Sequence, residues 1–111
     1  MEIQQQMHGA VASLKPLGPL TGEDAEHLKR KLLEVRARNL GRLVLDLSGV
    51  PFVDGLALEV LLATTEELAK SGQALKVCGE NEVLREVLEL TDLASRFEHF
   101  EDVKSAVRSF M

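Results

Sequence analysis

Few residues of this chain have the types and the spacing that catalysis or metal binding requires. The three histidines, His8, His27 and His99, are far apart in the sequence, and neither an HxxxH nor a CxxC spacing occurs, which argues against a zinc site. The single cysteine, Cys78, ends a short apolar run, and such a cysteine is usually a small buried side chain rather than a nucleophile. We therefore expect neither a metal ion nor a cofactor.

Other motifs of enzyme active sites are also absent. The chain has no glycine-rich phosphate loop of the Rossmann or Walker type. Ser48 precedes Gly49, but a nucleophile elbow needs a second glycine two positions before the serine, where this chain has Asp46. The adjacent carboxylates of Glu66 and Glu67 fall on the predicted exposed face of a helix and are expected to be solvated. We therefore expect that the chain is not an enzyme.

Composition argues against further classes of function. With 18 acidic and 13 basic residues, a net charge of −5 and neither Trp nor Tyr, the chain lacks the positive charge and the stacking rings that nucleic-acid binding uses. No apolar run approaches the length of a membrane span, and the N-terminus has no signal-peptide pattern. A lone cysteine suits a reducing compartment. We expect a globular cytoplasmic protein that binds no nucleic acid and inserts into no membrane.

Acidic residues are concentrated between Glu80 and Asp102, where eight of them stand against two arginines. Such a run usually lies on a solvated face. The alternative is a surface that attracts a basic protein partner.

The periodicity of apolar residues predicts the elements that must position any site. Short runs indicate strands, and apolar residues three and four apart indicate helices. The resulting order, β-β-α-β-α-β-α-β-α, predicts an α/β fold, a single layer of mixed sheet with helices packed on it. The predicted strands are 2–8, 10–15, 43–47, 74–78 and 97–100, and the predicted helices are 21–39, 55–70, 81–90 and 103–110.

The most informative segment is 45–62, where a buried strand ends, a loop turns and a helix begins. Asp54 is a suitable N-cap for this helix, because its carboxylate can accept a backbone N–H and favours the positive end of the helix dipole. Thr21 is expected to cap the preceding helix in the same way, with Asp24 reaching back toward it. In open α/β sheets, function is commonly placed at the carboxyl ends of the strands.

Residues 46–58, DLSGVPFVDGLAL, resemble the signature of the STAS domain found in bacterial anti-sigma factor antagonists, which has the form D-x-S-x-V-x-F-x-D-S-S-G-L. Residues 18–21, GPLT, fall where the family has G-E-L-D, and residues 75–79 and 83–92 follow the family's fourth strand and third helix. The resemblance covers essentially the whole chain and implies a single STAS domain, 1–111. The matching signature positions are Asp46, Ser48, Val50, Phe52, Asp54 and Leu58.

The chain departs from this family where the resemblance would place the regulatory chemistry. The serine that the partner kinase phosphorylates in the antagonists corresponds to Leu56, which has no hydroxyl. Gly55 stands where the family often has Ser or Thr, and Ala57 where it has glycine. Leu56 is either an exposed contact for a partner or part of the core. Thr21 and Ser48 are expected to form local hydrogen bonds rather than to replace the serine.

The resemblance implies a non-catalytic protein-interaction module that binds an anti-sigma kinase or another STAS-binding regulatory partner in sigma-factor or stress signalling. An alternative is an accessory subunit that attaches to the ATPase of a phospholipid-transport ABC complex. A third is a small-ligand sensor with an anion at the helix start, which the acidic residues there oppose. The expected partner-binding residues are Thr21, Gly22, Asp54, Gly55, Leu56, Ala57 and Glu59.

The first predicted strand is expected at an edge of the sheet. An uncovered edge can pair with another strand, so a homodimer is a further expectation.

Overall fold

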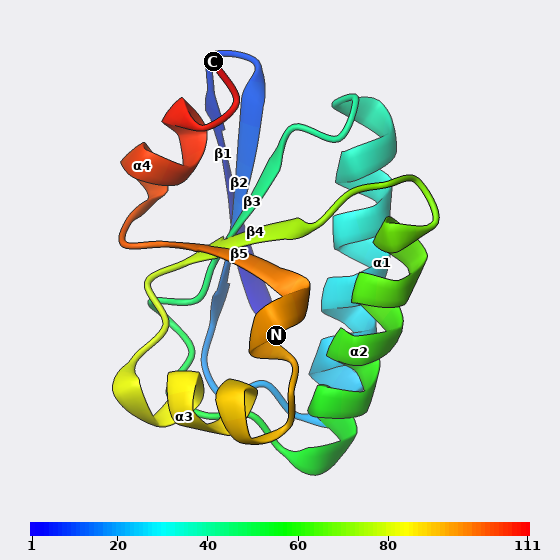
Figure 1. The fold of residues 1–111 in the computed structure, drawn as a ribbon, viewed down its shortest axis with the longest axis vertical. Coiled ribbons are helices and arrows are strands. Elements are labelled where there is room, and N and C mark those ends of the chain that lie inside the picture. Colours follow the sequence, from blue (N-terminus) through cyan, green and yellow to red (C-terminus); the bar gives the residue numbers. More distant parts are fainter.

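The computed structural model describes residues 1–111 and has a five-stranded sheet at its centre (Figure 1). The predicted order of strands and helices is confirmed, and no boundary differs from the prediction by more than two residues. A short 3₁₀ turn, Ala94–Arg96, was not predicted. The strands are β1 (Glu2–His8), β2 (Val11–Leu17), β3 (Leu43–Asp46), β4 (Leu75–Cys78) and β5 (Phe97–Phe100), and the helices are α1 (Gly22–Arg38), α2 (Gly55–Ala69), α3 (Glu82–Leu90) and α4 (Val103–Arg108).

The sheet is mixed, and its spatial order is the order of the sequence, β1-β2-β3-β4-β5. β1 and β2 form an antiparallel hairpin in which His8 lies opposite Val11. Gly9 lies in the turn with a φ of +64°, a conformation that glycine adopts without steric cost. The remaining pairs, from β2 to β5, are parallel, as the nearly continuous apolar run at 43–47 predicted.

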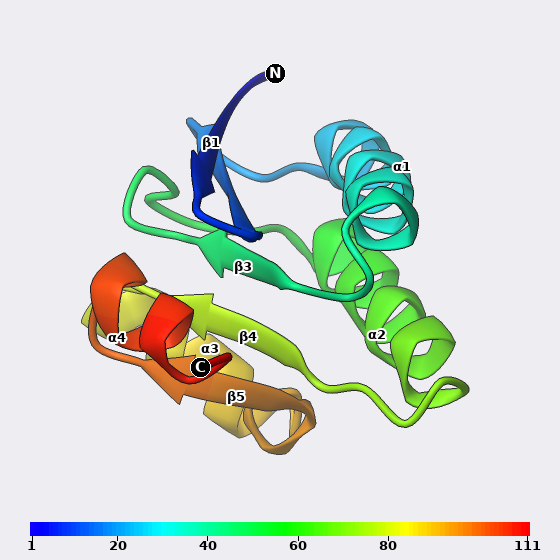
Figure 2. The ribbon, with the colours of Figure 1, turned by 90° about the horizontal axis from the view of Figure 1, so that it is seen from above.

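Helices cover both faces of the sheet (Figure 2). α1, α2 and α3 contribute to a large cluster on one face, together with residues of every central strand. α4 covers a smaller cluster on the opposite face. α1 and α2 lie side by side with both N-termini at the same end of the molecule (Figure 1). The members of the smaller cluster are Val11, Val44, Cys78, Ala106 and Val107.

Lys76 connects α4 to the sheet. Its Nζ donates to Ser109 Oγ over 2.6 Å and lies 4.0 Å from the centroid of the Phe110 ring. Glu98 lies 3.8 Å from the same nitrogen. A half-buried ammonium over an aromatic face is stabilised by the ring quadrupole, so this lysine holds the end of the chain against β4.

Cys78 lies under α4, and we predict that it reacts slowly. Burial raises the pKa of its thiol to about 12, and the nearby carboxylates of Asp46 and Glu80 add to the effect. Because the thiolate is the reactive form, the folded thiol remains protonated and unreactive at neutral and mildly alkaline pH. Iodoacetamide labelling followed by mass spectrometry should show no modification of native protein at pH 8 and complete modification in urea. Rapid labelling of the native protein would contradict this burial.

Candidate functional site

One carboxylate joins the N-termini of two helices. Asp54 Oδ1 accepts from the backbone N–H of Ala57 at 2.7 Å, which caps α2 as the sequence predicted. Asp54 Oδ2 accepts from the N–H of Gly22 at 3.2 Å, at the first residue of α1. Backbone N–H groups in the first turn of a helix have no partner within the helix. A single aspartate therefore satisfies one such donor in each of two helices and places its charge at both positive dipole ends.

The chain segments before the two helices are also paired with each other. Leu20 and Val53 form a parallel bridge. The Leu20 N–H donates to Phe52 O at 3.0 Å, and the Asp54 N–H donates to Leu20 O at 3.2 Å. We refer to residues 20–22 and 52–57 together as the helix-start joint. Leu20 is fully buried beneath it, so this joint is a fixed part of the fold rather than two independent loops.

Leu56 is exposed, which excludes the alternative that it belongs to the core. Its side chain is 64% exposed, while its base lies against Gly22. A Cβ atom added to Gly22 would lie 2.6 Å from the Cβ of Leu56, a distance that real Cβ atoms do not reach. The absence of a side chain at Gly22 thus permits α1 and α2 to begin close together and leaves the tip of Leu56 facing solvent.

The predicted capping role of Thr21 is wrong. Thr21 has the extended conformation of an N-cap residue but makes no side-chain cap. Its hydroxyl instead donates to Asp24 Oδ2 at 3.1 Å, while Asp54 accepts from the N–H of Gly22. Asp24 also lies 3.6 Å from the amino group of Met1. The Thr21 hydroxyl is directed toward the Asp24 carboxylate, a strong acceptor, and so does not accept from the N–H of Glu23 or Asp24 as an N-cap side chain would.

The other predicted partner-binding residues differ in exposure. Gly55 and Glu59 are exposed and Asp54 is half-buried. Ala57 is fully buried, so its side chain cannot be offered to a partner in this conformation. Gly55 and Leu56 of the joint are therefore open to solvent, as is Glu59 further along α2, while Asp54 is partly covered.

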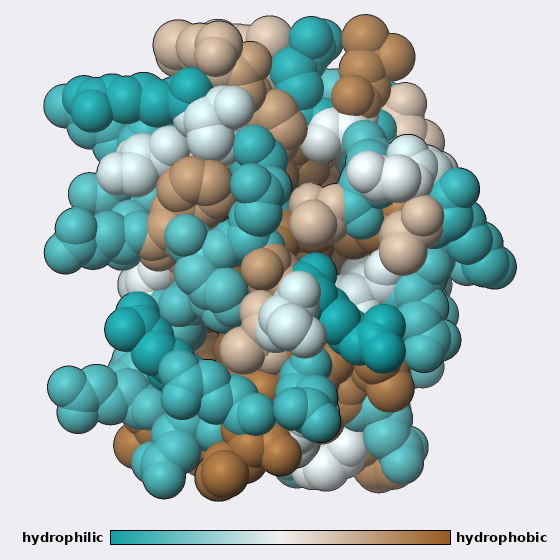
Figure 3. Space-filling model, viewed as in Figure 1, coloured by the Kyte–Doolittle hydropathy of each residue, from teal (hydrophilic) through white to brown (hydrophobic).

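Two exposed apolar residues, Phe52 in the joint and Val83 near it, were not predicted as site residues. Phe52 is 51% exposed and Val83 is 62% exposed. Asn81, the N-cap of α3, donates to the carbonyl oxygen of Pro51 at 3.1 Å, which brings the start of α3 beside the loop that carries Phe52. Hydrophobic atoms gather at this lower end of the molecule, where α2 and α3 begin (Figure 3). The sequence signal for Val83 was that α3 has five apolar residues, of which only Leu84 and Leu88 are buried and Val83 and Leu90 are exposed.

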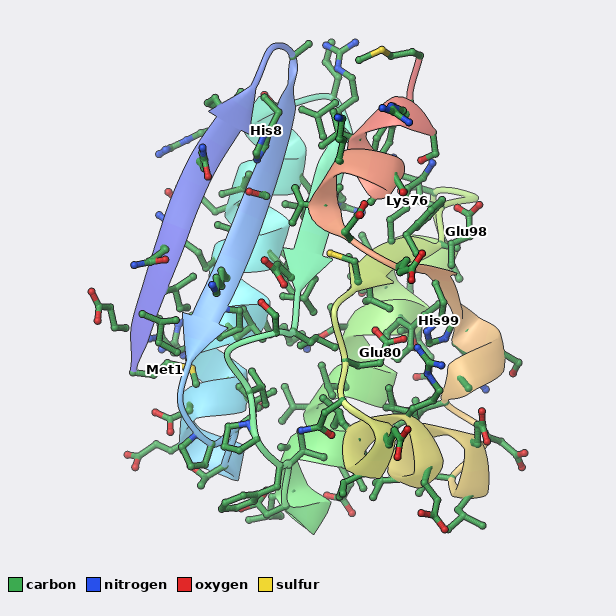
Figure 4. The ribbon with its side chains drawn as sticks, turned by 90° about the vertical axis from the view of Figure 1, so that its left-hand side faces the viewer. Met1, His8, Lys76, Glu80, Glu98 and His99 are labelled. Carbon is green, nitrogen blue, oxygen red and sulfur yellow. The ribbon has the colours of Figure 1, made fainter.

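The acidic stretch 80–102 is solvated except at its first member. Glu80 is buried, whereas the other seven acidic residues are exposed, so the predicted solvated face is wrong for Glu80 alone. Glu80 Oε1 lies 3.0 Å from His99 Nδ1 and 3.5 Å from an Arg85 nitrogen (Figure 4). His99 Nε2 lies 2.9 Å from the Ala94 carbonyl oxygen. A carbonyl oxygen only accepts, so His99 Nε2 is the donor in the contact with Ala94.

Neither a metal cluster nor a membrane span is found in the structure. No group of three or more His, Cys, Asp or Glu side chains is arranged to hold a metal ion. None of the helices combines the length and the apolar character that crossing a bilayer requires.

We predict that Asp54→Ala lowers the free energy of unfolding by about 1–3 kcal/mol, because a helix N-cap contributes about 0.5–2 kcal/mol and Asp54 serves two helices. Asn81→Ala is the control, since Asn81 caps α3 alone through the N–H of Leu84 at 2.7 Å. Urea unfolding should rank Asp54→Ala as the less stable variant. Equal or reversed midpoints would contradict the double cap.

We also predict that His99→Ala destabilises the fold by about 1–3 kcal/mol, because it removes a hydrogen-bond partner from the buried Glu80 side chain. His27→Ala is the control, since His27 is exposed on α1 and its loss should leave stability almost unchanged. Both variants can be compared by urea unfolding. A His99→Ala midpoint equal to wild type would show that Arg85 alone compensates Glu80.

Comparison with known proteins places this geometry in a family. The model of the STAS domain matches residues 2–106. A curated relative, the anti-sigma-F factor antagonist RsfB of Mycobacterium tuberculosis, is 33% identical over 102 residues, which cover 90% of this chain and 81% of that protein. The structure of an anti-sigma factor antagonist from Mycobacterium paratuberculosis is 25% identical with a TM-score of 0.79, covering 97% of this chain and 92% of the other. A Thermotoga maritima protein of 22% identity has a TM-score of 0.83, covering 96% and 92%. The chain belongs to the STAS domain family.

Proposed function

We propose that this chain is a non-catalytic regulatory protein that binds an anti-sigma factor through the helix-start joint. The observation that carries the proposal is the exposed apolar tip of Leu56, held between two helix N-termini that Asp54 joins. The 33% identity to an anti-sigma-F factor antagonist over most of both chains supports the same function.

The joint has the properties of a contact surface. Leu56 and Phe52 are large apolar side chains that remain more than half exposed, and residues of this kind carry much of the binding energy when a partner covers them. Their backbone is rigidly positioned, so little conformational entropy is lost on binding. Exposed carboxylates follow the two parts of the joint in the sequence, at Glu23 and Glu59, and Glu82 follows Asn81, whose side chain donates to Pro51 O. The complementary partner surface is therefore apolar at its centre and basic at its rim.

Regulation of this contact differs from that implied by the family resemblance. A phosphate at the start of α2 would add a charge of roughly −1.5 to −2 beside the contact surface. Leu56 has no hydroxyl and cannot carry one. Binding through the joint is therefore not released by phosphorylation at this position, and the chain acts as a permanent competitor for its partner.

A charge introduced at Leu56 should weaken this binding. Leu56→Asp places a carboxylate where the apolar side chain is exposed, and partner binding would have to remove water from that carboxylate. The dissociation constant should therefore rise at least about tenfold, which corresponds to a loss of about 1.4 kcal/mol of binding free energy. Leu40→Asp is the matched control, because Leu40 is 78% exposed at the other end of α1. Isothermal titration calorimetry with the captured partner measures both. Equal affinities for Leu56→Asp and wild type would remove the joint from the interface.

The partner itself is identified by purifying the tagged chain from its own host and analysing its companions by mass spectrometry. An anti-sigma kinase is the expected companion. An ABC ATPase recovered with its membrane subunits would replace the proposal with an accessory role in transport. Incubation of the purified complex with ATP should add no phosphate to this chain. Phosphorylation of another residue, such as Thr21 or Ser48, with release of the partner would contradict permanent binding.

A further inference from the structure

The outer edge of β1 is long and unprotected. β1 is the terminal strand of the sheet, and in Figure 4 it forms the outer border between Met1 at one end and His8 at the other. Five of its seven residues are exposed. The strand has no proline, and between Glu2 and His8 it has no charged residue, although proteins commonly protect such edges with both. β5, at the opposite edge, has only four residues, which include Glu98.

The register of the sheet identifies the backbone groups that face outward. The Ala12 N–H donates to Arg42 O at 3.0 Å, so Ala12 directs its backbone toward β3. Met7 lies opposite Ala12 across the hairpin and therefore belongs to a pair that does not exchange hydrogen bonds. The same alternation applies to Gln5 and Ile3, and Ile3 lies opposite Pro16, which has no N–H. Ile3, Gln5 and Met7 thus present unpaired N–H and C=O groups at the edge.

We propose that β1 pairs antiparallel with β1 of a second copy of this chain, about a two-fold axis at Gln5. In this register every outward N–H and C=O of the strand finds a partner, because Gln5 lies opposite Gln5 and Ile3 opposite Met7. The two five-stranded sheets then form one continuous sheet.

The side chains match in this register over the whole length of the strand. Ile3 and Met7 lie on the face that carries the large core cluster, where Ile3 is partly buried and Met7 is 51% exposed. Pairing places the Ile3 of one copy beside the exposed Met7 of the other. On the opposite face, Glu2 lies opposite His8 and Gln4 opposite Gln6. Apolar cross-strand pairs stabilise a sheet, and facing Gln–Gln and Glu–His side chains are polar groups that can hydrogen-bond across the strands.

Neighbouring registers are less favourable. An axis at Gln4 would place Ile3 opposite the amide of Gln5 and leave His8 beyond the paired region. An axis at Gln6 would place Met7 opposite Gln5 and leave Glu2 and Ile3 unpaired. The residue types of β1 are thus symmetric about Gln5, and the second copy is the partner that this symmetry fits.

Single cysteines in β1 test both the dimer and its register. Hydrogen-bonded antiparallel pairs have Cα atoms about 5.5 Å apart, within the range of a disulfide. Gln5→Cys should therefore form a covalent dimer under mild oxidation, whereas Gln4→Cys and Gln6→Cys should cross-link at least several-fold less. The wild type is the background control, because Cys78 is buried. Preferential cross-linking at position 4 or 6, or equal yields at all three, would overturn the register.

The dimer is tested without oxidation by sedimentation equilibrium over a range of concentrations. Gln5→Pro removes an outward N–H without removing a β1–β2 hydrogen bond, and it should raise the dimer dissociation constant at least about tenfold. Gln5→Lys, which places two like charges opposite each other at the axis, should act in the same direction. A wild-type chain that remains monomeric, or a dimer unaffected by both variants, would overturn the proposal. Thermal unfolding checks that both variants remain folded.

Discussion

The arrangement of the end of this molecule where α1 and α2 begin depends on the carboxylate of Asp54. Its two oxygens accept backbone N–H groups from the first turns of α1 and α2, so one side chain from the β3–α2 loop sets the relative position of two helices. The bond to Gly22 joins residues 32 positions apart. A negative charge at two positive dipole ends is favourable for each helix. It also gives the two helices a common starting point, from which they run side by side over the sheet.

Close packing at this point determines what the surface presents. Gly22 has no side chain, and Leu56 occupies the space where one would lie. The base of Leu56 is therefore held in place while its tip remains exposed. A rigid apolar tip suits protein recognition, because little order has to be gained on binding. In the proposed function this residue replaces a phosphorylation switch with a permanent contact.

The two proposals concern separate parts of the sheet. The helix-start joint lies in the loops and helix starts at one end of the strands, whereas the proposed dimer uses only the outer edge of β1. The backbone hydrogen bonds of the proposed dimer form at that edge and do not involve Leu56 or Phe52. A dimer would thus carry two helix-start joints. A partner with two matching sites would bind such a dimer more tightly, because binding at the first site raises the effective concentration of the second joint.

Local pattern was sufficient to predict the element order, the mixed sheet, the capping of α2 by Asp54 and the burial of Cys78, because periodicity, turn residues and cap chemistry act within a few positions along the chain. The resemblance of residues 46–58 to a known signature correctly indicated the STAS family. Only the tertiary structure decided that Asp54 also accepts from Gly22, that Leu56 and Val83 face solvent, and that Glu80 is buried against His99. Each of these depends on which residues far apart in the sequence come together and on the space left between them.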